Sequence, residues 1–246
     1  MLKVNIDKIT VSNNHTKHLL LKKIDFELFE GKVYTILGKN GTGKSTLIKS
    51  LTNLLNENIF SINGNIIWDK KNISDYDADE LLQIRKNKIR YVFQDAANSF
   101  DPLKTFRYYF ETSLADKNKI DELLEYFLLP DYNEISRLYS YEVSGGMAQR
   151  LSVILAFLAE PQLIILDEPT SGIDYAISNL LLLKIKKFTK KENKIVLIVT
   201  HDIIFSENVS DELALLSEGT LTQFKTKVEF FAMQDIDLLN SIKEVQ

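Results

Sequence analysis

Cysteine is absent from this sequence of 246 residues. Without thiols, the chain can form no disulfide bond, no thiolate metal site and no cysteine nucleophile. Long apolar runs are also missing, because the longest, Val153 to Ala159, is far shorter than the ~20 residues of a membrane-spanning helix. The first residues, MLKVNIDKIT, have no apolar segment of the kind found in secretory signals. We therefore expect a soluble chain that acts in the cytosol.

Neither sign of charge is in large excess. Lysine and arginine together number 30 against 34 for aspartate and glutamate, which gives a net charge of -4. Proteins that bind nucleic acid through bulk electrostatics carry a surplus of positive charge, so we expect no nucleic-acid partner. Hydrophobic residues make up 45% and charged residues 26%, the mix of a globular protein with a substantial core.

Glycine is scarce, with 9 residues in the whole chain. Six of them fall in three short stretches, at Gly38, Gly41, Gly43, Gly145, Gly146 and Gly172. Because glycine lowers stability where its conformational freedom is not needed, such clusters indicate special backbone geometry.

Strands and helices are predicted to alternate along most of the chain. The predicted strands lie at 2–11, 24–29, 33–37, 89–93, 163–167 and 195–199, and the predicted helices begin at Lys44 and cover 79–88 and 174–191. The helix from Lys44 extends through Leu54 and Leu55, which share its apolar face. The pair Asn63-Gly64 predicts a hairpin turn between two strands within 59–68.

Residues 95–160 show helical and aromatic patterns and no convincing strand. The pattern therefore predicts an α/β fold with a mostly parallel core sheet. The alternating strands at the N-terminus form an antiparallel side sheet in this interpretation, and 95–160 form a helical insertion. We expect one domain over 1–246, with 1–94 and 161–246 forming the core and the antiparallel part.

Residues 38–45, GKNGTGKS, fit the phosphate-loop pattern G-x-x-x-x-G-K-[ST] between a predicted strand and a predicted helix. Its glycines let backbone N–H groups turn inward around phosphate oxygens, and the helix adds its positive end. Lys44 is expected to reach the β- and γ-phosphates, and the Ser45 hydroxyl to bind Mg²⁺. The alternative is a glycine-rich turn with an isolated lysine. We interpret the loop as a nucleoside triphosphate site.

A pair of carboxylates follows the predicted strand 163–167. Asp167 and Glu168 stand at its carboxyl end, where ligands of open α/β sheets bind. Asp167 can hold Mg²⁺ through water, and Glu168 can polarise a water toward the γ-phosphate, which indicates hydrolysis. A strand that simply ends at Pro169 is the alternative interpretation.

A second candidate anion site lies at Ser144-Gly145-Gly146, before an apolar helix. Since the chain already has a phosphate loop, this second site is best explained if it holds a nucleotide bound to another subunit. Arg150 in the same stretch is explained equally well by a surface salt bridge.

Together these segments resemble the nucleotide-binding subunit of an ABC transporter, and the likeness runs through nearly the whole chain. Residues 144–150, SGGMAQR, resemble the family's signature, 38–46 its phosphate loop and 163–168, LIILDE, its magnesium-carboxylate strand. Residues 171–174, SGID, are similar to its D-loop, His201 to its switch histidine and Gln94 to its Q-loop glutamine.

The resemblance implies the P-loop NTPase fold of an ABC cassette, with ATP and Mg²⁺ as ligands. The implied site residues are Glu168, His201 and Gln94 for catalysis; Gly38, Lys39, Asn40, Gly41, Thr42, Gly43, Lys44, Ser45, Thr46 and His15 for nucleotide binding; Ser144, Gly145, Gly146, Met147, Ala148 and Gln149 for a partner's ATP; Ser171, Gly172, Ile173 and Asp174 for the D-loop; and Ser45, Gln94 and Asp167 for the metal.

One part of the family fits best. Residues 93–102, FQDAANSFDP, resemble a stretch in importers of peptides and nickel that commonly reads FQDP-x-x-S-L-x-P, with Ala96 in place of the proline. Met147, where most cassettes have glutamine, is similar to the same group. The resemblance implies a second, different ATPase subunit, two transmembrane permeases and an extracytoplasmic binding protein. It places the chain on the cytoplasmic face of the cell membrane as a peripheral subunit.

The platform for the nucleotide base is unusual. ABC cassettes usually stack adenine on an aromatic residue after the first strand, and here that place falls at His15, with His18 as the alternative. Residues 12–18, SNNHTKH, contain no Tyr, Phe or Trp. Since imidazole offers less stacking area than a phenol ring, we expect modest ATP affinity and some use of GTP. His15 as a solvated loop residue is the alternative.

Two functions other than transport are the alternatives. A non-transport ABC ATPase, such as one for iron–sulfur assembly, is compatible with the chain length but fits the stretch after Gln94 poorly. A module that only holds ATP is disfavoured by Glu168.

Overall fold

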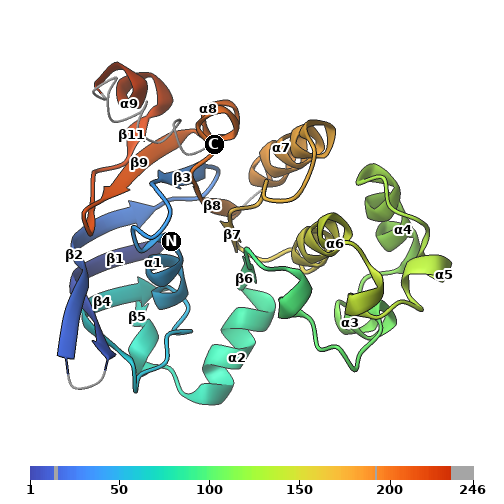
Figure 1. Cartoon of the computed structure of the whole chain (residues 1–246), viewed down its shortest axis with the longest axis horizontal. Helices are drawn as coiled ribbons and strands as arrows, with labels where there is room; N and C mark the ends of the chain where they lie inside the picture. Colours follow the sequence, from blue (N-terminus) through green and yellow to red (C-terminus); the bar gives the residue numbers. More distant parts are fainter. Residues whose placement is uncertain (14–15, 192, 234–246) are drawn as a thin grey trace.

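Two β-sheets form the centre of the computed structural model, which describes residues 1–13, 16–191 and 193–233 (Figure 1). The strands are β1 (Leu2–Asn13), β2 (Thr16–Leu28), β3 (Val33–Leu37), β4 (Phe60–Trp68), β5 (Lys71–Asn72), β6 (Ile89–Val92), β7 (Leu163–Asp167), β8 (Ile195–Thr200), β9 (Glu212–Ser217), β10 (Thr220–Leu221) and β11 (Lys225–Thr226). The helices are α1 (Lys44–Ser50), α2 (Ala78–Asn87), α3 (Phe106–Thr112), α4 (Lys117–Tyr126), α5 (Tyr132–Ile135), α6 (Gly145–Leu158), α7 (Tyr175–Thr189), α8 (Ile203–Val209) and α9 (Lys227–Met233).

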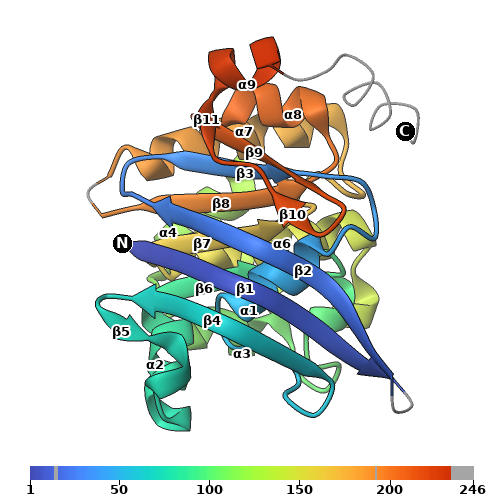
Figure 2. The same ribbon diagram turned by 90° about the vertical axis from the view of Figure 1, so that its left-hand side faces the viewer.

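The antiparallel sheet has the strand order β2-β1-β4-β5. Its long strands cross in front of the core strands in Figure 2. Leu2, Val4 and Ile6 alternate with exposed residues along β1 and are fully or almost fully buried. The alternating pattern therefore predicted this side sheet correctly.

The predicted hairpin at Asn63-Gly64 is wrong, because β4 runs straight through it. Gly64 pairs with Ile6 and Asn63 with Lys8, so β1 carries one extra residue, Asp7, at this point. A Cβ atom on Gly64 would lie 2.3 Å from the backbone oxygen of Asn5, and its φ is +134°. The glycine is thus required by a bulge and a close backbone approach.

The core sheet has the order β10-β9-β3-β8-β7-β6, with β11 also paired to β9. Strands β9, β3, β8, β7 and β6 are parallel to their neighbours, whereas β10 and β11 pair with β9 in antiparallel fashion. Every residue of β3, β7 and β8 is buried, which explains their continuous apolar sequences. Because the strands are parallel, their carboxyl ends meet at one edge.

Helices cover both faces of the parallel sheet. One apolar core lies between the two sheets and includes Leu47, Ile48 and Leu51 at α1. The other joins the opposite face of the sheet to α6, α7 and the helical region. Figure 1 shows α3, α4 and α5 at the end of the molecule farthest from the antiparallel sheet, with α6 between them and the strands. Residues 95–160, all of them described, contain no strand and one isolated bridge, Thr105 with Tyr139.

The helix that begins at Lys44 is shorter than predicted and ends at Ser50. Asn53 adopts a left-handed conformation with φ 51°, and the N–H of Leu54 then bonds to the carbonyl of Lys49. Asparagine tolerates this conformation and closes helices in this way. Leu54 and Leu55 therefore lie beyond the helix, although Leu55 still packs against the inter-sheet core.

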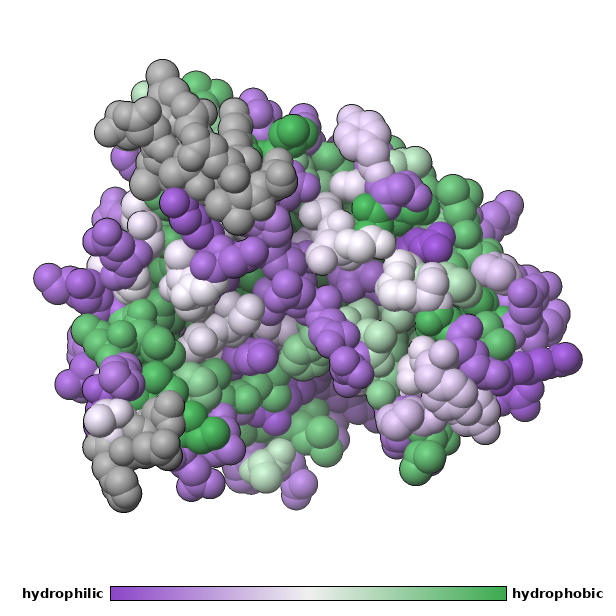
Figure 3. All heavy atoms as spheres, in the orientation of Figure 1, coloured by the Kyte–Doolittle hydropathy of each residue, from purple (hydrophilic) through white to green (hydrophobic). Residues whose placement is uncertain are grey.

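No helix in the described part of the chain is long and apolar enough to cross a membrane. Polar and apolar residues are interspersed over the face in Figure 3, and no single apolar patch covers it.

Candidate functional site

The phosphate-loop sequence lies between β3 and α1, at the carboxyl edge of the parallel sheet. Gly41 and Gly43 have φ values of +79° and +97°, which side chains disfavour. A Cβ atom on Gly38 would lie 2.6 Å from the carbonyl oxygen of Leu216, and one on Gly43 would lie 2.9 Å from Cδ2 of Leu21. The loop is thus pressed against β9 and β2, and three of its glycines are required by its geometry.

Lys44 is a buried cation at the start of α1, with 5% of its surface exposed. Its Nζ donates hydrogen bonds to the carbonyl oxygens of Gly38 at 2.8 Å and Lys39 at 3.1 Å. It also lies 3.1 Å from Oε1 of Glu168. The ammonium group is therefore held inside the loop and beside the carboxylate that follows β7.

Asp167 ends β7 and is 2% exposed. Its Oδ1 accepts a 3.2 Å hydrogen bond from the Ser45 hydroxyl, and its Oδ2 accepts one of 2.9 Å from the Tyr91 hydroxyl. Burial raises the pKa of Asp167 above its ordinary value, while the hydroxyls of Tyr91 and Ser45 oppose that rise. Burial also raises the pKa of Tyr91, next to the Asp167 charge. Tyr91 was not predicted, because nothing in its own segment marks it as part of a site.

Glu168 has a φ of 47°, a strained conformation for a glutamate. Its Oε2 accepts hydrogen bonds from the Thr200 hydroxyl at 2.7 Å and the His201 amide at 3.2 Å. Nδ1 of His201 lies 3.0 Å from the same oxygen. Because an ionised carboxylate only accepts, this contact assigns the ring proton to Nδ1. The expected base and the expected switch histidine are therefore in direct contact.

Two adjoining hollows surround these side chains. One, of about 430 Å³, is lined by Ser45, Lys49, Gln94 and Asp167, among others. The other, of about 360 Å³, is lined by Leu20, Gln94 and Glu168 and by the loop residues Asn40, Gly41, Gly43, Lys44, Ser45 and Thr46. Gln94 is exposed and borders both hollows. Lys49 and Leu20, which line these hollows, were not predicted from the sequence.

The expected base platform is not brought to the site by the described residues. His15 lies outside them. His18 is exposed on β2, opposite Val11 and 3.1 Å from the Thr16 hydroxyl, and it lines neither hollow. Leu20, two residues further along β2, is the side chain of that strand that does.

The signature-like segment begins α6. The Ser144 hydroxyl caps this helix by accepting a 3.2 Å hydrogen bond from the N–H of Met147. Ser144 and Gly145 are exposed, whereas Ala148 and Gln149 are buried. No residue of 144–149, all of which are described, lines either hollow. Only the first turn of the segment is therefore available to a partner.

The D-loop-like segment, 171–174, packs against that turn. A Cβ atom on Gly146 would lie 2.9 Å from the carbonyl oxygen of Gly172. Asp174 caps α7 through a 2.9 Å hydrogen bond from the N–H of Ile177. Ser171, Gly172 and Asp174 are exposed and Ile173 is half-buried, so the two segments form one accessible surface.

Arg150 has a structural role. Its Nε donates to the carbonyl of Gly146 at 3.0 Å, and its Nη1 donates to those of Phe127 and Leu128 at 3.0 and 3.1 Å. The guanidinium thus fastens α6 to the end of α4 through backbone carbonyls, and it makes no surface salt bridge within the described residues.

The donor set fits Mg²⁺. In the described part of the chain no group of three or more His, Cys, Asp or Glu residues could hold a metal. Mg²⁺ keeps several waters and uses one or two carboxylates, together with hydroxyls and substrate phosphates. The hydroxyl of Ser45 and the carboxylate of Asp167, in contact beside the loop, are oxygen donors of this kind.

The fold is similar to those of solved ATP-binding cassettes. A dimeric bacterial ABC transporter cassette, MJ0796, superposes with a TM-score of 0.80 at 25% identity, covering 92% of this chain and 99% of that one. The structure of cbiO1 from Clostridium perfringens, part of the ABC transporter complex cbiONQ, gives a TM-score of 0.73 at 26% identity, covering 94% of this chain and 90% of that one.

Curated relatives are named as ATP-binding proteins of transport or import systems. The oligopeptide transport ATP-binding protein OppD of Lactococcus lactis is 31% identical over 217 residues, 85% of this chain and 64% of the relative. The metal-staphylopine import system ATP-binding protein CntD of Staphylococcus aureus is 28% identical over 236 residues, 92% and 87% of the two chains. The chain thus spans about two thirds of the OppD length.

The family model described as "ABC transporter" matches residues 21–171, from β2 through the phosphate loop, the signature-like turn and the carboxylate pair. That range covers more than half of the chain. The chain belongs to the ABC transporter family.

Proposed function

We propose that this chain is the ATP-binding and ATP-hydrolysing subunit of an ABC importer. The observation that carries the proposal is the connected set of contacts at the carboxyl edge of the parallel sheet. Lys44 meets Glu168, Glu168 meets His201, and Ser45 meets Asp167 there, all beside a glycine-rich loop. This combination supports the binding of a triphosphate and the activation of water next to it.

Each side chain has a role that follows from its chemistry. Lys44 and the loop N–H groups hold the β- and γ-phosphates. Glu168 accepts a proton from the attacking water, and Thr200 and His201 fix the direction of its carboxylate. Gln94, which borders both hollows, would respond to the γ-phosphate end of the substrate.

Mg²⁺ would be held by Ser45 and, through water, by Asp167, with Gln94 as a further oxygen donor. When bound, it neutralises phosphate charge during hydrolysis. The 2.9 Å hydrogen bond from Tyr91 keeps the Asp167 carboxylate turned toward Ser45.

The site is completed by another subunit in this proposal. The exposed turn at Ser144 and Gly145 offers N–H groups and a hydroxyl that this chain's own hollows do not use. A second ATPase subunit, of a different sequence, would bring its nucleotide to this turn, and the exposed residues of 171–174 would join the same interface. Two permeases and an extracytoplasmic binding protein complete the importer, with this chain on the cytoplasmic face of the membrane.

The cargo is proposed from the relatives. OppD is named for oligopeptide transport, DppD of Bacillus subtilis for dipeptide transport and CntD for metal-staphylopine import. A peptide, nickel or a metal chelate is therefore the proposed solute class. These import subunits do not favour the alternative of iron–sulfur assembly.

An uptake experiment tests the proposal in cells that carry the gene. We would replace Glu168 with Gln in the chromosome and measure uptake of labelled dipeptides, oligopeptides and nickel. Glu207, an exposed glutamate on α8, provides the matched control as Glu207→Gln. We expect uptake of one solute to be lost with Glu168→Gln alone. Unchanged uptake of all of them would refute the importer assignment.

A further inference from the structure

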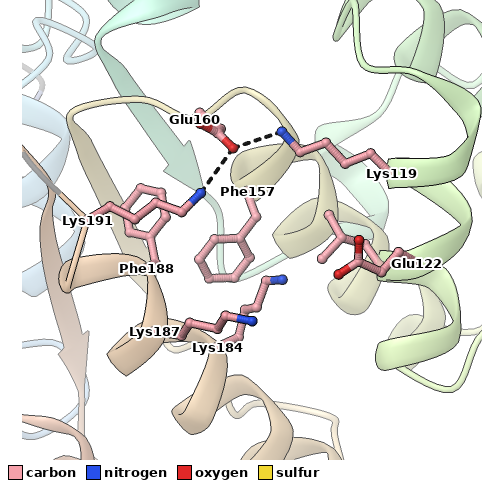
Figure 4. Close-up of a pocket in the computed structure, with 9 residues that line it drawn as sticks. Lys119, Glu122, Phe157, Glu160, Lys184, Lys187, Phe188 and Lys191 are labelled. Carbon is pink, nitrogen blue, oxygen red and sulfur yellow. Dashed lines mark hydrogen bonds and ion pairs between the residues drawn. The ribbon is translucent and has the colours of Figure 1, made fainter.

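A cavity of about 190 Å³ lies where the ends of α4, α6 and α7 meet (Figure 4). Lys119 lines it from α4, Phe157 from the end of α6, and Lys184 and Lys187 from α7. The cavity opens near the amino end of β7, whereas Asp167 stands at the carboxyl end. A strand of this length spans roughly 16 Å, so the cavity is separate from the nucleotide site.

Lysines outnumber carboxylates around this cavity. Four lysines and two glutamates line it, in a chain whose net charge is -4. Glu160 is shared by two of the lysines, at 2.8 Å from Lys119 and 3.2 Å from Lys191. Figure 4 shows Glu160 between these two ammonium groups, with Lys184 and Lys187 on the other side of Phe157.

The two lysines that line the cavity from α7, Lys184 and Lys187, are without a carboxylate partner among the described residues. Lys184 is half-buried, and its ammonium lies 5.2 Å from the ring centre of Tyr126 and 6.0 Å from that of Phe157. Burial lowers the pKa of Lys184, and the charges of Lys187, Lys191 and Lys119 act in the same direction against Glu122. The positive charge around Lys184 therefore exceeds the negative charge that the neighbouring carboxylates provide.

The remaining wall is apolar and fixed. Phe157 and Phe188 are 4% and 5% exposed, and their rings meet edge to face with centroids 5.4 Å apart. Such a wall excludes water on one side of the ammonium groups and strengthens their attraction for an anion. The cavity is smaller than the ~300 Å³ at which pockets for drug-sized ligands begin, which favours a compact ligand over a whole nucleotide.

We propose that this cavity binds a small phosphate-bearing anion: inorganic phosphate, pyrophosphate or a small phosphate ester. Lys184 and Lys187 supply the unpaired charge, and Lys119 and Lys191, shared by one glutamate, supply the rest. Several ammonium groups around one point suit a multiply charged phosphate, which lysine binds as a point charge. Because Lys119 belongs to the helical region and Lys184 to α7, the bound anion ties those two parts together.

The test is thermal unfolding of the full chain in the presence of pyrophosphate, phosphate or glycerol phosphate, each compared with NaCl at equal ionic strength. All variants carry Lys44→Ala, so that the phosphate loop does not contribute. The cavity variant is Lys184→Gln with Lys187→Gln. The control is Lys186→Gln with Lys190→Gln, which makes the same charge change at or next to α7 with exposed lysines outside the cavity.

We expect at least one of the three anions, at about ten times its Kd, to raise Tm by about 3 °C or more in the Lys44→Ala chain and in the control. The rise should be lost in the cavity variant. Without added anion, the cavity variant should unfold at the same temperature as its parent or higher, because repulsion between lysines has been removed. That second readout separates lost binding from a damaged fold.

Two results would overturn the proposal. One is a rise in Tm of equal size in the cavity variant and the control, and the other is no rise with any of the three anions. If Lys44→Ala itself unfolds the chain, the same comparison is made with Lys44 intact and the nucleotide site saturated with ADP and Mg²⁺.

Discussion

The hydroxyl of Tyr91 donates a 2.9 Å hydrogen bond to Oδ2 of Asp167. The parallel register places Tyr91 beside Ile165, and Asp167 follows two residues later on the same face of β7. A long side chain from β6 can therefore reach the end of β7. With Ser45 bonded to Oδ1, both oxygens of the carboxylate are oriented from within the chain.

Replacing Tyr91 with Phe should weaken Mg²⁺ binding at Asp167, so that nucleotide binding requires a higher Mg²⁺ concentration. Residues that orient a metal ligand typically change metal affinity by about 10- to 100-fold, so the Mg²⁺ midpoint should rise at least tenfold. The Mg²⁺ midpoint is measured by titrating the binding of a fluorescent ATP analogue at a series of Mg²⁺ concentrations, with EDTA as the metal-free reference. Tyr108→Phe, a change at a half-exposed ring of α3, is the control. An unchanged midpoint would remove Tyr91 from the metal site.

Replacing Lys44 with Ala should abolish ATP hydrolysis and nucleotide binding. Loss of charge stabilisation in phosphoryl transfer costs about 10³-fold or more in rate. The matched control is Lys86→Ala, since Lys86 is an exposed lysine of α2 that lines neither hollow. Phosphate release and fluorescent-nucleotide titration on both variants measure the difference. Normal turnover by Lys44→Ala in the assembled complex would show that the site assignment is wrong.

Replacing Glu168 with Gln should preserve ATP binding and slow hydrolysis. The amide keeps the shape of the side chain but cannot accept the proton. It also removes the negative charge 3.1 Å from Lys44, so the ammonium is freer to meet phosphate. Size-exclusion mass with and without Mg·ATP should show an ATP-trapped dimer. Wild-type turnover would exclude Glu168 as the base.

Ser144 can be tested without disturbing α6. Ser144→Asp keeps an N-cap of equal quality but places a negative charge where a partner's phosphate is proposed to bind. Tm and ATP binding by the isolated chain should stay the same, whereas hydrolysis by the assembled complex should be lost. If the isolated chain loses ATP binding instead, the signature-like turn belongs to this chain's own pocket.

Glu160 should make the thermal stability of the fold depend on pH. The hydrogen bond from Lys119 lowers the pKa of Glu160 from 4.5 to about 2, with Lys191 acting in the same direction. When folding lowers the pKa of a carboxyl group, the resulting stabilisation is complete above the unfolded-state pKa. It is lost as the pH falls toward the folded-state pKa. Glu160→Gln should therefore lower Tm at pH 7, with a difference that shrinks between pH 4.5 and 2. A difference that is constant with pH would rule out the charge as its cause.

The sequence alone predicted those elements whose structure depends on residues close together in the chain. The apolar runs at β3, β7 and β8 and the loop at 38–45 were located correctly, because each follows from neighbouring residues. The pair Asn63-Gly64 carries a local turn signal, but its conformation is set by Ile6, more than fifty positions away. Pairing between distant strands overrides turn propensity there.

Side chains that act across strands could not be predicted for the same reason. Tyr91 joins Asp167 only through the register between β6 and β7, and Leu20 reaches the loop only because β2 passes beside Gly43. The helix after Lys44 was overextended because the apolar spacing continues beyond Asn53, whose left-handed backbone ends it.

Gly146 leaves no room for a side chain against the carbonyl of Gly172. The signature-like turn and the D-loop-like turn are therefore in close backbone contact. Thr170 then donates a 3.3 Å hydrogen bond to Asp202, whose neighbour His201 contacts Glu168. In the proposed dimer, a displacement of these turns by the partner's nucleotide would be transmitted through these contacts to Glu168, the proposed base of this chain's own site. The two ATP sites would thus be conformationally coupled.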